Sequence, residues 1–298
     1  AVLSALPPLS SAWRRLVEFA ADYYQRATGE VALAAVPPQL REINSAQLER
    51  RLKKLAKAKA TANRSTIPSH ALCSTVGNLD GEVDNRADAI NLISLSEEQA
   101  RAVAQFHQNF GPFLLFGATG SGKTEVFMRC TAELLAKSNH AQALVMVPEI
   151  NLTPQLEDRF KARFCGLYGE DAVVSMHSGM TPAQRLNAWL AAHSGAARVV
   201  LGTRMAVFAS MPQLKLIIVD EEHDPSYKSQ EGARYSARDL AIYRARVETQ
   251  HGRPCQVILG SATPSLESWQ ACEKGRYQRL AMPSRIGDGR LPAVKLVD

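Results

Sequence analysis

The sequence predicts an α/β domain in which a parallel sheet is covered by helices on both faces, preceded by a small, mostly helical region. From residue 95 on, short apolar runs such as FLLF and LKLIIVD alternate with stretches of helical length. Apolar strands that alternate with helices are typical of a parallel sheet buried on both faces. The predicted strands cover residues 113–116, 143–147, 172–176, 198–202, 214–220 and 256–260. The predicted helices between them cover residues 124–137, 154–163, 182–193 and 237–250.

Two further helices are predicted before residue 65. Residues 1–44 carry an apolar stripe at helical spacing between Trp13 and Tyr24. Residues 45–64 place three leucines on one side of a second helix, with Ser45 as its N-cap. The polar, turn-rich stretch that follows, to about residue 94, is typical of a linker or of a small, weakly cored module.

Composition excludes several classes of protein. Hydrophobic residues make up 46% of the 298 residues and charged residues 21%, as in soluble globular chains rather than disordered or fibrous ones. No uncharged apolar run is long enough to span a membrane. The first residues lack both Met and the basic start of a signal peptide, which indicates a chain that begins inside a longer protein. Five scattered cysteines without a CxxC pair argue against a disulfide framework or a zinc site and favour the reducing cytoplasm.

Basic charge is concentrated in one segment. The net charge is +6, and residues 41–64 hold eight basic and two acidic residues, so the rest of the chain is neutral overall. Such an excess favours a polyanionic partner, although a basic run is also typical of a solvated helix face.

The strongest signal is the sequence GATGSGKT, which follows the apolar run FLLF and opens a predicted helix. This strand–loop–helix context is the one that a phosphate-binding P-loop requires. Backbone N–H groups of such a loop surround phosphate oxygens, and the helix N-terminus adds positive potential. Lys123 is expected to reach the β- and γ-phosphates, and the Thr124 hydroxyl to bind Mg²⁺. The predicted nucleotide-binding residues of the loop are Gly117, Ala118, Thr119, Gly120, Ser121, Gly122, Lys123 and Thr124.

A second acidic contribution follows the predicted strand 214–220. Asp220 ends this strand and is expected to hold Mg²⁺, while Glu221 orients or deprotonates the attacking water. Taken alone, the tetrapeptide DEEH favours a solvated acidic turn. Its position after a buried strand, 97 residues beyond Lys123, favours the nucleotide site instead.

Other residues are weaker candidates for the same site. Gln99 lies ahead of the first predicted strand and either offers its amide to the adenine edge or is an exposed polar residue on a helix. Thr203 and Arg204 follow one strand, and Ser261 and Thr263 follow another. Hydroxyl groups and backbone amides at strand ends suit phosphate contacts, but they are also ordinary helix caps.

In this order, GATGSGKT, VPEINLTPQ, GTRMAVF, DEEH and GSATPS resemble motifs I, Ia, Ib, II and III of the superfamily 2 helicases. The stretches MVPEINLTPQLEDRF, HSGMTPAQRLNAW and DEEHDPSYKSQEGARYSARDLAIYRA narrow the resemblance to the PriA family of primosomal replication-restart DNA helicases. The N-terminal AADYYQRATGEVALAAVPPQLR resembles the end of that family's 3′-DNA-end-binding domain. The likeness is tightest over residues 95–298 and poor over residues 45–90.

The resemblance implies a division of the chain into four parts. Residues 1–44 would be a remnant of the 3′-DNA-end-binding domain. Residues 45–94 would be a basic helix and linker, or a degenerate winged-helix region. Residues 95–280 would form a RecA-like helicase lobe, and residues 281–298 would begin the connection to a second lobe.

The resemblance also implies an activity, which is that of an ATP-driven 3′→5′ DNA helicase that restarts stalled replication forks with ATP and Mg²⁺ as cofactors. Its catalytic residues would be Lys123, Asp220 and Glu221, with Thr124 and Asp220 on the metal and Gln99 among the ATP contacts. Coupling of the nucleotide state to DNA would use His223, Ser261 and Thr263. The implied partners are single-stranded and forked DNA, single-strand-binding protein and other primosome proteins, in the cytoplasm and away from membranes.

The stretch 224–237 would be an aromatic-rich loop that senses single-stranded DNA. Its tyrosines can stack on bases while its basic residues meet phosphates. The alternative is a mobile polar loop. The predicted DNA contacts in and near this loop are Thr203, Arg204, Tyr227, Lys228, Arg234 and Tyr235.

Departures from the family limit what this chain is expected to do. The second lobe, its arginine finger and the family's zinc-binding cysteines have no counterpart in the sequence. We therefore expect weak binding of Mg·nucleotide, nearly absent ATPase activity and no zinc. The alternatives are another superfamily 2 DNA or RNA translocase, a P-loop kinase, which the strand-end motifs and the long spacing to DEEH disfavour, and a DNA-binding scaffold with a vestigial nucleotide site.

Overall fold

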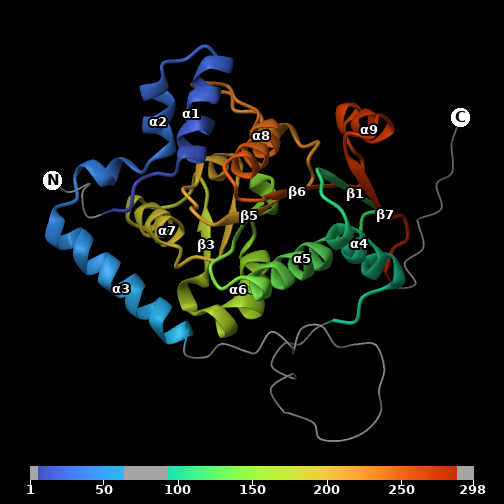
Figure 1. Ribbon diagram of the computed structural model, residues 1–298, viewed down its shortest axis with the longest axis horizontal. Coiled ribbons are helices and arrows are strands. Elements are labelled where there is room, and N and C mark those ends of the chain that lie inside the picture. Colours follow the sequence, from blue (N-terminus) through green and yellow to red (C-terminus); the bar gives the residue numbers. More distant parts are fainter. Residues whose placement is uncertain (1–5, 64–92, 287–298) are drawn as a thin grey trace, which may run out of the picture.

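A single parallel sheet of seven strands forms the centre of the structure, a computed structural model that describes residues 6–63 and 93–286 (Figure 1). The strand order is β3-β4-β2-β5-β6-β1-β7. The strands are β1 (Phe113–Gly117), β2 (Gln142–Met146), β3 (Val173–Met176), β4 (Val199–Gly202), β5 (Leu214–Val219), β6 (Gln256–Ser261) and β7 (Gln278–Met282). The predicted α/β class is confirmed, and the first six strands lie within two residues of their predicted positions.

Nine α-helices and several short 3-10 helices connect the strands within the described residues. The α-helices are α1 (Ser11–Tyr23), α2 (Thr28–Ala35), α3 (Ser45–Asn63), α4 (Glu97–Gln108), α5 (Lys123–Lys137), α6 (Pro154–Tyr168), α7 (Pro182–Ser194), α8 (Ala237–Gln250) and α9 (Leu266–Glu273). The 3-10 helices are η2 (Pro38–Arg41), η5 (Glu149–Asn151), η6 (Glu170–Ala172), η7 (Arg204–Phe208) and η8 (Pro225–Tyr227). The predicted helix 237–250 coincides with α8, whereas α6 continues five residues beyond its predicted end.

The sheet is buried on both faces, which explains the continuous apolar runs in its central strands. Leu114 and Ile217 belong to the core cluster on one face, which α1, α7 and α8 cover. Leu115 and Ile218 belong to the cluster on the other face, which α4, α5 and α6 cover (Figure 1). Successive residues of a strand point to opposite faces, so every position of such a strand needs an apolar side chain.

Sequence reasoning missed β7, the strand at one edge of the sheet. It begins with two polar residues, and of its five residues only Leu280 and Met282 are buried. Arg279, directly before Leu280, is exposed and lies over the Trp269 ring, 5.1 Å from its centroid. An edge strand with a solvent-exposed face lacks the continuous apolar run by which the other strands were predicted.

The N-terminal helices pack onto the sheet domain. Trp13 on α1 donates its indole N–H to the Phe208 carbonyl (2.7 Å), and Phe19 stacks on Tyr243 of α8. Side chains of α1 therefore belong to the same core cluster as α8 and the sheet. The predicted division at residue 44 stays a prediction.

Helix α3 has the predicted apolar side but a different N-cap. Leu48 is buried, and Leu52 and Leu55 pack partly against the core. The predicted cap, Ser45, is the first residue of the helix itself. Asn44 caps it instead, because its Oδ1 accepts the Gln47 N–H (2.9 Å) and its carbonyl accepts the Leu48 N–H. An asparagine is as good a cap as a serine, and here it is one residue earlier.

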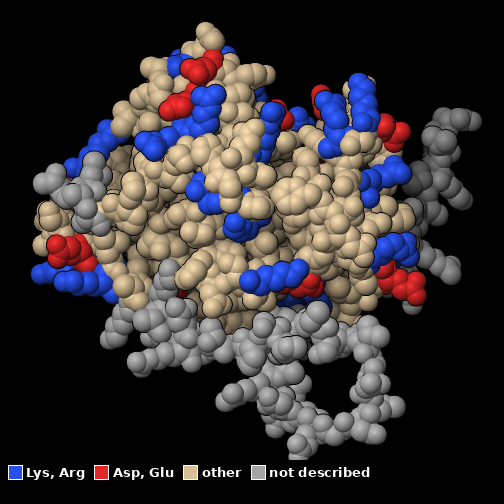
Figure 2. Space-filling model, in the orientation of Figure 1, with Lys and Arg blue, Asp and Glu red and all other residues tan. Residues whose placement is uncertain are grey.

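Charge on the face seen in Figure 2 is distributed in small groups of Lys and Arg side chains rather than in one dominant patch. Most of the predicted winged-helix region, residues 64–92, and most of the predicted connection to a second lobe, residues 287–298, lie outside the described residues. Within the part that is described, no helix has the length and apolar character needed to cross a membrane.

Candidate nucleotide-binding site

The glycine-rich loop lies between β1 and α5, at the carboxyl edge of the parallel sheet. Gly120 and Gly122 adopt left-handed backbone conformations, with φ of 84° and 79°. Only glycine adopts such angles without cost, so the spacing of these glycines is what lets the chain turn into α5. Lys123 is the first residue of that helix, which directs the helix N-terminus at the loop.

The loop has the features of an anion cradle. A Cβ added to Gly117 would lie 2.6 Å from Ser121 Oγ and 3.2 Å from Lys123 Cγ, so no side chain fits there. The Ser121 hydroxyl is buried and has no hydrogen-bond partner among the described residues. A buried hydroxyl without a hydrogen-bond partner destabilises the fold unless a ligand supplies the missing hydrogen bond. These residues therefore fit the phosphates of a nucleotide.

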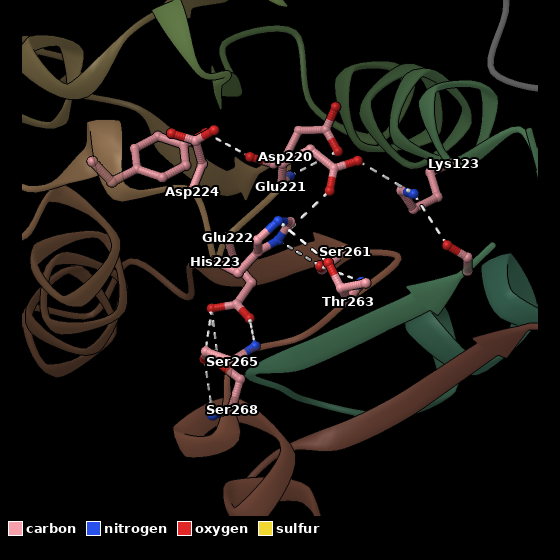
Figure 3. Close-up of polar contacts among 12 residues, drawn as sticks. Lys123, Asp220, Glu221, Glu222, His223, Asp224, Ser261, Thr263, Ser265 and Ser268 are labelled. Atoms are coloured by element: carbon pink, nitrogen blue, oxygen red, sulfur yellow. Dashed lines mark hydrogen bonds and ion pairs between the residues drawn. The ribbon is translucent and has the colours of Figure 1, made fainter. Parts of the chain in front are cut away.

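Lys123 brings its charge to the acidic turn that follows β5 (Figure 3). The side chain is buried, and its Nζ donates to the Gly117 carbonyl (3.1 Å) and lies 3.4 Å from Glu221 Oε1. The acidic turn and the P-loop follow strands that are separated only by β6. The structure thus brings together Lys123 and Glu221, two of the three residues predicted to be catalytic.

Asp220, the third residue predicted to be catalytic, has a carboxyl group that resists ionisation. Burial and, to a lesser extent, the charge of Glu221 raise its pKa to about 6, while Lys123 opposes the shift. Its Oδ1 accepts the Glu221 N–H (3.0 Å), and Glu221 itself has a positive φ of 45°. Strained non-glycine conformations of this kind cluster at functional sites.

The residues fit Mg²⁺ bound to a nucleotide rather than a metal held by protein alone. No group of three or more His, Cys, Asp or Glu side chains that could hold a metal ion occurs within residues 6–63 and 93–286. Mg²⁺ on a nucleotide keeps several waters and needs only one or two protein oxygens. Thr124 and Asp220 are the predicted ligands, and hydroxyl and carboxylate oxygens are the donors this ion prefers.

The pKa of Asp220 leads to a stability prediction. The pKa of Asp220 is about 6 in the folded state and about 3.8 in the unfolded chain. The folded state therefore binds this proton more tightly, so the free energy of unfolding falls as the pH rises between these two values. Asp220→Asn removes the penalty, and we expect it to raise the free energy of unfolding by about 3 kcal/mol at pH 7.5. The gain should shrink towards zero near pH 4. Urea unfolding at both pH values measures it, and an equal gain at both contradicts the assignment.

His223 links the acidic turn to the end of β6. Its Nδ1 lies 2.8 Å from Ser261 Oγ, and its Nε2 lies 3.3 Å from Thr263 Oγ1. Ser261 Oγ also accepts the Thr263 N–H (3.0 Å). The three residues predicted to couple the nucleotide state to DNA are therefore one hydrogen-bonded group, beside Glu221 (Figure 3).

Glu222, which sequence reasoning did not single out, points away from the nucleotide site (Figure 3). Its buried carboxylate accepts the Ser265 N–H (2.7 Å) and the Ser268 hydroxyl (3.0 Å). The carboxylate also forms an ion pair with Arg238, whose Nη1 lies 3.2 Å from Glu222 Oε2. Four consecutive polar residues in DEEH gave no sign that the second glutamate faces inward, because that depends on the fold of α8 and α9.

Gln99 braces the P-loop. It is 2% exposed, so the expectation of an exposed polar residue is wrong. Its Oε1 accepts the Ser96 N–H (2.9 Å), and its Nε2 donates to the Ser121 (3.4 Å) and Gly122 (3.2 Å) carbonyls. Both ends of the amide are thus engaged in this conformation, and the adenine contact stays a prediction.

The structure contradicts base stacking by Tyr227 in this conformation. The ring is 2% exposed, and the hydroxyl donates to the Asp220 carbonyl (2.6 Å). A tyrosine packs this way when the core can bury its ring and the hydroxyl finds a partner. Tyr235 is half-buried and packs edge-on against Phe208, whereas Lys228 and Arg234 are exposed.

The other two predicted DNA contacts lie at the end of β4. Thr203 is buried, and its N–H donates to the Met176 carbonyl (3.0 Å). Arg204 is partly buried, and its Nη1 donates to the Ser226 carbonyl (3.4 Å). Thr203 is thus inaccessible to DNA in this conformation, because the turn into η7 buries it.

Comparison with known proteins agrees with this site. A family model described as DEAD/DEAH box helicase matches residues 96–271, from the start of α4 into α9. The chain belongs to the DEAD/DEAH box helicase family. The resemblance to superfamily 2 helicases inferred from the sequence motifs is therefore confirmed.

Curated relatives of this helicase-family chain are longer proteins. Replication restart protein PriA of Haemophilus influenzae is 45% identical over 203 residues, which cover 67% of this chain and 26% of the relative. The protein of the same name from Treponema pallidum is 35% identical over 280 residues, which cover 93% of this chain and 36% of the relative. The chain thus spans about a quarter to a third of their length.

A solved structure shows the same fold. The DUF1998 helicase MrfA bound to DNA and AMPPNP superposes with a TM-score of 0.51 at 18% identity, over 68% of this chain and 29% of that one. At this identity the likeness shows the fold of a helicase lobe and nothing finer.

Proposed function

We propose that the protein to which this chain belongs is an ATP-driven DNA helicase and that the chain provides its nucleotide-binding motor lobe. The observation that carries the proposal is the meeting of Lys123 with Glu221, at 3.4 Å, beside the carboxyl group of Asp220. Burying a lysine opposite a pair of carboxylates costs free energy. A site that no longer bound nucleotide would gain nothing from this arrangement.

Each residue of the site has a proposed task. Bound Mg·ATP supplies the phosphoanhydride bond that is broken and the metal that neutralises its developing charge. Lys123 holds the β- and γ-phosphates, and Thr124 and Asp220 hold the metal. Glu221 orients the attacking water and accepts its proton. His223 transmits the change in nucleotide state, through its hydrogen bonds, to the turn that carries Ser261 and Thr263.

We propose replication restart as the cellular role, supported by the relatives named PriA at 45% and 35% identity. In this role the protein unwinds DNA from 3′ to 5′ in the bacterial cytoplasm. It meets single-stranded and forked DNA, single-strand-binding protein and other primosome proteins. Lys228 and Arg234, both exposed, are the proposed phosphate contacts of the loop that follows the acidic turn.

The chain on its own should bind nucleotide but turn it over at a rate near background. Related phosphoryl-transfer enzymes gain about 10³–10⁵ in rate from an arginine brought by a facing partner. The described residues form one lobe, with no second lobe to face it. Release of phosphate from ATP, measured with and without single-stranded DNA, tests this expectation. A DNA-stimulated turnover typical of a complete helicase contradicts it.

A further inference from the structure

The segment between the acidic turn and α8, residues 224–236, forms a closed loop. Lys228 and Ser236 pair as an antiparallel bridge, and the Ser229 N–H donates to the Tyr235 carbonyl (2.8 Å). A loop closed by such pairs moves as one body, because its two arms cannot separate without breaking them. What its two ends touch therefore decides how it responds to the nucleotide site.

Both ends of this loop are attached to the acidic turn. Near its start, the Tyr227 hydroxyl donates to the carbonyl of Asp220 (2.6 Å). Just beyond its end, Arg238 in the first turn of α8 places Nη1 3.2 Å from Glu222 Oε2. The same Nη1 lies 3.0 Å from the hydroxyl of Ser265, the N-cap of α9.

Glu222 joins these groups to the turn that follows β6. Its carboxylate accepts the N–H of Ser265 (2.7 Å) and the hydroxyls of Ser265 (3.1 Å) and Ser268 (3.0 Å). The side chain of Glu222 is fully buried, and that of Arg238 is 20% exposed. A buried carboxylate that loses its cation is strongly destabilised, so this pair resists separation.

We infer that Glu222 and Arg238 are positioning residues that make the loop 224–236 and the turn 261–265 move together. The turn carries Ser261 and Thr263, which bond to His223, and Glu222 lies between His223 and Glu221 in the chain. A change at the phosphate end of the site therefore reaches the loop along two routes, through Tyr227 at its start and through Arg238 at its end. This inference rests on the proposed nucleotide-binding function.

Hydrogen exchange of the full chain, read by mass spectrometry with and without Mg·ADP, tests the link. In the wild-type chain we expect Mg·ADP to slow exchange by about tenfold or more in the P-loop, the loop 224–236 and the turn 261–265. In Arg238→Met the P-loop and the turn should keep this protection, while the loop should keep only the part that is transmitted through Tyr227. Arg238→Lys, which keeps the charge but not the planar guanidinium whose Nη1 contacts both Glu222 and Ser265, should fall between them.

The matched control is Arg253→Met. Arg253 also pairs with a buried glutamate, Glu248 in the last turn of α8, with Nη2 2.7 Å from Glu248 Oε2. This pair lies at the opposite end of α8 from Arg238. We expect the control to keep the wild-type response in all three segments. If Arg238→Met fails to fold, Glu222→Gln takes its place, since it keeps oxygen and amide groups near the serines but removes the charge.

Three results overturn the inference. The first is a loop that does not respond to Mg·ADP in the wild-type chain although the P-loop does. The second is a loop that responds equally in Arg238→Met and the wild type. The third is no protection of the P-loop at all. That result refutes the proposed nucleotide site and also the coupling of the loop 224–236 to it.

Discussion

Replacing Lys123 with alanine should lower the affinity for Mg·nucleotide by about 10- to 100-fold. The amine is buried in the loop and faces the place where phosphates would lie, between the Gly117 carbonyl and Glu221. A charge-assisted hydrogen bond contributes about 1.5–3 kcal/mol, and each 1.4 kcal/mol is a factor of ten in affinity. Titration of a fluorescent ADP analogue in the presence of Mg²⁺ measures the loss.

Lys137→Ala is the matched control for this experiment. Lys137 is exposed at the far end of the same helix, α5, so its removal changes the net charge equally without touching the loop. We expect its affinity to stay within about twofold of the wild type, as for a screened surface charge. Equal losses in the two variants, or no loss in Lys123→Ala, would favour the scaffold with a vestigial site.

Replacing Arg244 with methionine should destabilise the chain by about 3 kcal/mol. Arg244 on α8 is 1% exposed and donates to the carbonyls of Val207 and Ala209, each at 2.7 Å. Methionine fills much of the space but leaves two buried carbonyls without a donor, at about 1–3 kcal/mol for each. Thermal unfolding followed by circular dichroism should show a decrease in Tm of about 6–12 °C.

Arg246→Met serves as the control for that decrease. Arg246 lies two residues further along α8 and is exposed, so its loss should shift Tm by little more than a degree or so, as is typical of surface substitutions. Equal shifts in the two variants would show that Arg244 is not the residue that holds η7 to α8.

Most of the fold could be predicted because the central strands are buried on both sides. Such strands contain continuous apolar runs, as LIIV in LKLIIVD and VIL in QVILG, and these runs stand out from the polar sequence around them. Strand β7 escaped because its exposed positions, such as Arg279, interrupt the apolar run. The N-cap of α3 was misplaced by one residue, since Asn44 and Ser45 are both good caps and only the hydrogen bonds distinguish them.

The candidate site could be predicted as far as its residues follow parallel strands. Lys123 and Asp220 are far apart in sequence, but Asp220 directly follows β5 and Lys123 follows β1 after the glycine-rich loop, and the carboxyl ends of these strands share one edge of the sheet. The pairing of Glu222 with Arg238 could not be predicted, because it depends on how α8 packs. The burial of Tyr227 could not be predicted either, since an aromatic ring with a hydroxyl suits a core and a DNA contact equally well.

The proposed function depends on binding of a magnesium nucleotide by the loop between β1 and α5. Equilibrium titration of the wild-type chain with fluorescent Mg·ADP, followed by competition with unlabelled ATP, tests it most directly. We expect saturable binding at one site, displacement by ATP, and weaker binding when Mg²⁺ is chelated. A folded chain that shows no saturable binding would contradict it.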